Sequence, residues 1–113
     1  MAALKPYLYL AIAIVFEVIG TSALQASQSL TRLVPSLVTV VAYGASFVFL
    51  ALTLRSIPVG LAYAMWSGVG IVLIAAVGWV WFRQALDTPA LVGLSLIIAG
   101  VIVVNVFSKS LPH

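Results

Sequence analysis

The sequence predicts an all-α integral membrane protein with four transmembrane helices and short loops, and three observations support this. About 65% of the 113 residues are hydrophobic and only 6% are Asp, Glu, Lys or Arg, whereas a soluble domain carries roughly 25% charged residues. The charges leave long apolar intervals: 22 residues separate Arg32 from Arg55, and 27 separate Arg55 from Arg83. Another 21 separate Asp87 from Lys109. Each interval exceeds the ~20 apolar residues that a helix needs to cross a bilayer.

We therefore expect a single four-helix domain over residues 1–113, with spans near 6–24, 34–54, 59–82 and 89–108. The loops that these spans leave are short, so successive helices should be antiparallel neighbours. Pro35, Pro58 and Pro89 fall near the predicted helix starts, where the missing N–H of proline costs least. The same composition argues against a soluble enzyme, a nucleic-acid-binding domain and a disordered chain.

The first span is interpreted as an anchor and not as a cleaved signal peptide. Lys5 followed by an apolar run is compatible with a signal peptide. However, the run from Tyr7 to Leu24 is longer than the ~7–15 apolar residues of such a segment, and it has the carboxylate of Glu17 at its centre.

The loop charges bear on how the chain is oriented. Four spans place both termini and the loop at 55–58 on one side, with three basic residues, and leave two on the other side. The first set is Lys5, Arg55 and Lys109, and the second is Arg32 and Arg83. A difference of one positive charge sets orientation weakly. Two arrangements remain open: termini in the cytoplasm, or insertion both ways with pairing as an antiparallel homodimer.

Glu17 lies about ten residues into the first span, near the middle of the bilayer. An acidic residue at that depth costs at least ~2.5–3.5 kcal/mol on insertion scales and usually faces a cavity or a partner. No Lys or Arg lies inside any span, and burial without a countercharge disfavours the ionised form. The carboxylate is therefore suited to holding a proton or attracting a cation. The alternative is a permanently protonated Glu that only donates an interhelical hydrogen bond.

The third span offers side chains that suit such a cation. Tyr63, Trp66, Ser67 and Gly70 recur at intervals of three and four residues, so they share one helix face. Aromatic ring faces attract quaternary ammonium groups, and Tyr43 in the second span could join them. The alternative is that these aromatic residues form part of an interfacial belt.

Glycines suggest both a hinge and an interface. Gly68 and Gly70 weaken the third helix and form a candidate hinge, although glycines in membrane helices often serve only close packing. Gly93 and Gly100 align in the fourth span at the spacing that brings membrane helices together. Four helices do not easily enclose a cavity around Glu17, which also favours a dimer.

Motifs of soluble chemistry are missing. The one histidine is His113 and there is no cysteine, so the sequence offers no metal site. No phosphate-binding loop occurs and no base accompanies the Ser and Thr residues at a plausible depth. We expect no cofactor, no catalytic residues and no enzymatic activity.

Four sequence segments together resemble the small multidrug resistance family. They are Phe16-Glu17-Val18-Ile19-Gly20-Thr21, the run from Pro58 to Gly70 containing Tyr-Ala-x-Trp-Ser-Gly-x-Gly, Leu86-Asp87, and Ala99-Gly100-Val101-Ile102. The likeness covers almost the whole chain. The guanidinium-exporting branch typically has Trp and Thr where this chain has Gly20 and Ser67, so the chain is most similar to the branch that exports quaternary ammonium compounds.

The resemblance implies a proton-coupled antiporter that performs multidrug efflux of lipophilic, aromatic and quaternary ammonium cations. It implies an antiparallel, dual-topology homodimer, multi-pass in the bacterial inner membrane, whose partners are protons, cationic drugs, membrane lipid and its own second copy, with no nucleic acid. Glu17 would bind proton and substrate in turn. Substrate-binding residues would be Trp66, Tyr63, Tyr43, Ala13, Ile14, Gly20, Thr21, Ser46, Phe47 and Ser67. Gly68 to Gly70 would form the bend in the third helix, and Gly93 and Gly100 would lie in the dimerising helix.

Two positions depart from the family pattern. Gln25 and Ala85 stand where the family commonly has basic residues. Two other functions also remain open: a heteromeric polyamine or lipid carrier of the same fold, and a non-transporting small membrane subunit of a larger complex.

Overall fold

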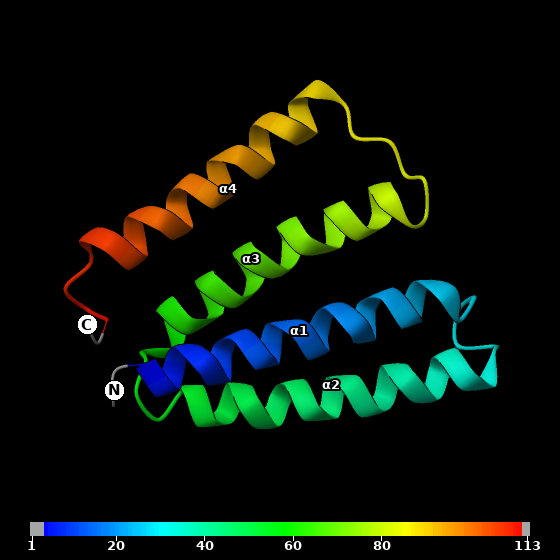
Figure 1. The fold of residues 1–113 in the computed structure, drawn as a ribbon, viewed down its shortest axis with the longest axis horizontal. Helices are drawn as coiled ribbons and strands as arrows, with labels where there is room; N and C mark the ends of the chain where they lie inside the picture. The colour runs from blue at the N-terminus through cyan, green and yellow to red at the C-terminus, as the bar shows by residue number, and fades with distance from the viewer. Residues whose placement is uncertain (1–3, 112–113) are drawn as a thin grey trace.

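The computed structural model describes residues 4–111, which form four α-helices in a row (Figure 1). They are α1 (Leu4–Ala26), α2 (Leu33–Thr53), α3 (Val59–Val80) and α4 (Thr88–Phe107). All four are long and apolar enough to cross a membrane, and α4, the shortest at 20 residues, is about 30 Å long. The predicted all-α, four-span architecture is confirmed. The helix ends fall within two residues of the predicted spans, and His113 lies outside the described residues.

The two ends of the molecule differ in their charged residues. Both described ends of the chain lie beside the α2–α3 connection, and the α1–α2 and α3–α4 connections lie at the opposite end (Figure 1). Lys5, Arg55 and Lys109 therefore belong to one end, and Arg32 and Arg83 to the other. We call these the terminal end and the loop end.

The terminal end contains the best-packed part of the chain. Ile57, which is 1% exposed, follows the tight turn after α2 and precedes Pro58 at the start of α3. It packs in one cluster with Leu10 and Ile14 of α1 and with Met65 of α3. Leu50 of α2 packs against this cluster, which therefore joins the first three helices at the terminal end.

Toward the loop end α3 diverges from α1, whereas α1 and α2 stay side by side (Figure 1). The α1–α2 connection begins at Ser27, which is fully buried. Its hydroxyl donates to the Leu24 carbonyl at 2.7 Å and accepts from the Leu30 N–H at 2.9 Å. These bonds close a compact turn that keeps α1 and α2 together. Because α3 diverges, the opening at this end lies between α1 and α3.

α4 packs against α3, on the side away from α1, and makes no extensive contact with α1 or α2. Its start is capped by Asp87, whose Oδ1 accepts from the Ala90 N–H at 3.0 Å, and Pro89 occupies its first turn. None of its 20 residues is buried. An apolar helix this exposed within one chain is available for contact with lipid or with another protein surface.

Candidate functional site

Glu17 lies half-buried in the middle of α1, at the start of a chain of two hydrogen bonds. Its Oε1 atom accepts from the Thr21 hydroxyl at 2.7 Å, and that hydroxyl lies 2.6 Å from the Tyr43 hydroxyl of α2. Because Thr21 has one proton and donates it to Glu17, Tyr43 is the donor of the second bond. Both hydroxyl dipoles therefore point toward the carboxylate, which stabilises its charge.

α2 is held against the turn of α1 that contains Glu17. A Cβ atom at Gly20 would lie 2.8 Å from the Tyr43 ring, so only glycine lets this ring pack so closely. One turn away, the buried Ser46 hydroxyl donates to the Ala13 carbonyl at 2.7 Å, the carbonyl that also accepts the helical N–H of Glu17. These contacts position the carboxylate relative to α2.

Glu17 and α3 border a cavity of about 260 Å³, which we call the inner cavity. It is lined by residues of α1 and α3: Glu17, Thr21, Tyr63, Trp66, Ser67, Gly70, Ile71 and Ile74. No Lys or Arg is among them. The cavity thus combines one carboxylate with aromatic, hydroxyl and aliphatic surface, which suits a bulky organic cation or, at the carboxylate alone, a proton.

Trp66 is the centre of an aromatic group on this wall. Its ring packs edge-on against Tyr63, at a centroid distance of 5.5 Å, and against Phe47 of α2 at 6.3 Å. Its indole Nε1 is buried and hydrogen-bonds to no residue within 4–111. Tyr63 is 59% exposed, so the inner cavity is open on that side.

The two α3 glycines predicted to form a hinge both allow close approach to another helix. A Cβ at Gly70 would lie 3.2 Å from Glu17 Oε2, and a Cβ at Gly68 would lie 2.9 Å from the side chain of Val101 in α4. α3 continues as an unbroken α-helix through both positions. The observed geometry accounts for the glycines by packing, and the hinge stays a prediction.

The other predicted residues fall into two groups. Ala13, Ile14 and Ser46 are buried between helices and do not line the inner cavity. Gly93 and Gly100 have open space where a Cβ would lie, so the face of α4 that was expected to dimerise is uncovered within one chain.

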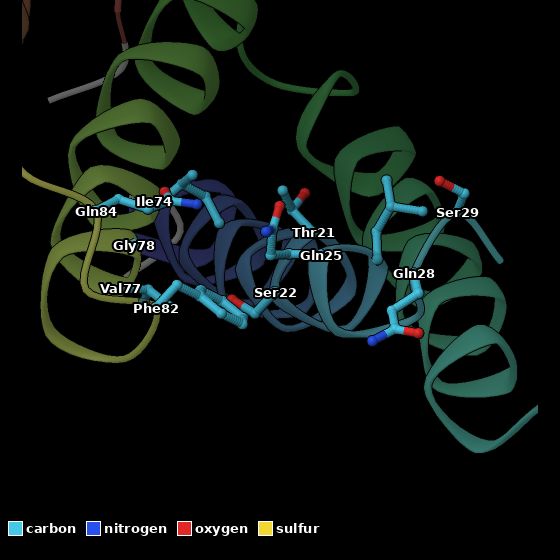
Figure 2. Close-up of a pocket in the computed structure, with 11 residues that line it drawn as sticks. Thr21, Ser22, Gln25, Gln28, Ser29, Ile74, Val77, Gly78, Phe82 and Gln84 are labelled. Atoms are coloured by element: carbon cyan, nitrogen blue, oxygen red, sulfur yellow. The ribbon is translucent and has the colours of Figure 1, made fainter. Parts of the chain in front are cut away.

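Sequence reasoning missed a second cavity of about 620 Å³ at the loop end, which we call the outer cavity (Figure 2). Six of its eleven lining residues are polar: Thr21, Ser22, Leu24, Gln25, Gln28, Ser29, Ile74, Val77, Gly78, Phe82 and Gln84. Thr21 and Ile74 line both cavities, so the outer cavity leads toward Glu17. The sequence does contain one indication of this cavity, because Gln25 lies two turns after Glu17 on the same face of α1.

Comparisons with known proteins agree with one another. A family model described as Small Multidrug Resistance protein matches residues 5–97. The chain is 54% identical to the multidrug transporter EmrE of Escherichia coli (strain K12) over 97% of its own length and 100% of the relative. It is 53% identical to the quaternary ammonium compound-resistance protein QacF of Klebsiella aerogenes and 52% identical to QacE of Escherichia coli, with the same coverage.

Proposed function

The chain belongs to the small multidrug resistance family, and from this we propose that it is a proton-coupled antiporter that exports lipophilic, aromatic and quaternary ammonium cations. It is a multi-pass protein of the bacterial inner membrane, and members of its family are transporters rather than enzymes. The observation that supports the proposal most directly is the position of Glu17, a lone carboxylate beside Tyr63 and Trp66 in a cavity without a basic residue.

Exchange follows from competition for one carboxylate. An ionised Glu17, stabilised by the Thr21 and Tyr43 hydroxyls, attracts an organic cation into the inner cavity. A protonated Glu17 is neutral, so the cavity then has no charge to hold the cation. Since each ligand excludes the other, a proton gradient can drive the cation in the opposite direction.

We propose that the functional unit is an antiparallel homodimer. The inner cavity of one chain is open where Tyr63 is exposed, and α4 has no buried residue. A second copy packed against the Gly93 and Gly100 face would cover α4, and close approach at small residues is a common way for membrane helices to associate. Two inverted copies can exchange roles when access changes sides, and the similar numbers of Lys and Arg at the two ends, three and two, are compatible with insertion in both directions.

Reconstitution of the purified chain into liposomes tests the proposed function. A pH gradient should drive uptake of ethidium or tetraphenylphosphonium, and addition of either cation to the protein in detergent should release protons. A heteromeric polyamine or lipid carrier would be inactive without its second chain. A non-transporting subunit would neither move the cation nor release protons, and either result would refute the proposal.

Trp66→Ala should weaken the binding of aromatic cations by about 1–3 kcal/mol, because it removes both a cation–π partner and apolar packing. The change removes the ring that Tyr63 and Phe47 contact but leaves the carboxylate in place. Isothermal titration with tetraphenylphosphonium and ethidium measures the loss, and a pH titration of the free protein should still detect Glu17.

Two controls accompany this variant. Trp66→Phe keeps a ring and should lose less affinity than Trp66→Ala. Trp79→Ala removes the same side chain at a position that is 61% exposed and lines neither cavity, so its affinities should stay at the parent level. Equal affinities for the parent and Trp66→Ala would show that Trp66 only packs.

A further inference from the structure

Carboxamides of three residues, from two separate chain segments, line the outer cavity. Gln25 and Gln28 come from the end of α1 and the turn that follows it, and Gln84 comes from the α3–α4 connection on the opposite wall (Figure 2). Within residues 4–111, none of the three carboxamides hydrogen-bonds to another residue. Their donors and acceptors are therefore available to a bound molecule or to water.

The backbone around Gln84 leaves room for its carboxamide. A Cβ at Gly78 would lie 2.5 Å from Gln84 Oε1, so the glycine is what allows the amide to lie over the end of α3. The Gly78 carbonyl accepts from the N–H groups of Phe82 and Gln84 at 3.2 and 2.8 Å. Arg83, between them, has a left-handed φ of 56°, which turns Gln84 back toward the cavity.

The opposite wall is also shaped by left-handed backbone. Gln28, Ser29 and Leu30 have φ values of 50°, 63° and 66°, a conformation that L-residues rarely adopt in succession. The buried Ser27 holds this turn, since its carbonyl accepts from the N–H groups of Thr31 and Arg32, both at 3.0 Å. The turn brings Gln28 and Ser29 to the rim of the outer cavity.

The outer cavity can receive a positive group without repelling it. No charged residue is among its lining, and Arg32 and Arg83, the basic residues of this end, are exposed outside it. Carboxamide oxygens accept hydrogen bonds from ammonium or hydroxyl groups, and the ring of Phe82 offers a surface for a cation. A molecule whose apolar head fills the inner cavity can extend past Thr21 into this space.

We propose that the outer cavity is a second subsite, which binds the polar end of elongated cations that bear a primary amine or another hydrogen-bond donor, with Gln25 and Gln84 as the acceptors. The subsite rests on the proposed function, because the apolar head of such a ligand occupies the inner cavity beside Glu17. It extends the expected substrates from compact lipophilic cations to elongated ones with a polar terminus.

The test compares two series of probes, ω-aminoalkyl triphenylphosphonium cations and alkyl triphenylphosphonium cations of equal chain length. Above the length that reaches past Thr21, the amine series should bind the parent protein roughly tenfold more tightly. Gln25→Leu and Gln84→Leu should each remove most of that advantage and leave the alkyl series within about twofold. Gln25→Lys should weaken the amine series further, since it places a like charge in the subsite.

Asn105→Leu is the matched control, because it removes a carboxamide that donates to the Val101 carbonyl at the terminal end, away from the cavity. It should leave the advantage of the amine series unchanged. Equal affinity of the two series at every length, or equal losses for both in the glutamine variants, would overturn the subsite. Failure of the alkyl series to bind in a pH-dependent manner would instead refute the proposed function, so the two failures are distinguishable.

Discussion

Glu17→Gln is expected to abolish pH-driven cation exchange while leaving membrane insertion intact. The amide keeps the shape of the side chain and can still accept the Thr21 hydrogen bond through its oxygen. Unlike the carboxyl group, however, it neither ionises nor binds a proton near neutral pH. The attraction that is lost is about 4 kcal/mol for a cation ~4 Å away at an effective dielectric constant of ~20. A loss of that size lowers affinity roughly 10³-fold.

Proteoliposome uptake of ethidium and proton release on addition of tetraphenylphosphonium measure this effect. Glu17→Asp keeps the carboxylate and should retain exchange over an altered pH range. Asp87→Asn is the matched control, because it makes the same chemical change at the other acidic residue of the chain, where asparagine also caps the start of a helix. Continued pH-driven export by the Glu17→Gln protein would falsify the mechanism.

A chain forced to insert in one direction is expected to lose resistance activity when it is expressed alone. Two variants bias the charges in opposite ways. Lys5→Ala, Lys109→Ala and Ala85→Lys together leave one basic residue at the terminal end and three at the loop end. Arg32→Ala with Arg83→Gly leaves three basic residues at the terminal end and none at the loop end. Glycine is chosen at position 83 because it suits the left-handed φ there. Since Lys and Arg in short loops set orientation, each variant should insert uniformly.

Coexpression of the two variants should restore resistance, because an antiparallel dimer needs one subunit of each orientation. Orientation can be read from a single Ser56→Cys reporter, since the chain has no native cysteine and Ser56 is exposed in the α2–α3 connection. Lys5→Arg with Lys109→Arg preserves the charge and should keep full activity. Full activity from a chain shown to insert one way only would rule out the antiparallel dimer.

The sequence by itself determined the helices and the position of Glu17 in the middle of the first one. Uncharged intervals, the turn at Pro58 and the start at Asp87 and Pro89 define helix ends through local backbone chemistry, so they can be read without a tertiary structure. The same regular repeat of the helix put Tyr63, Trp66, Ser67 and Gly70 on one face, and the structure does bring them to one cavity.

Only the tertiary structure decided which residues of different helices contact one another around Glu17. The Thr21–Tyr43 bond joins residues on different helices and depends on the close packing that Gly20 allows. The outer cavity exists because α3 diverges from α1 toward the loop end and because left-handed turns bring Gln28 and Gln84 back toward it. Helical periodicity is set within each segment by local hydrogen bonds, whereas these contacts depend on the angle and spacing between helices, which side-chain packing sets across segments distant in sequence.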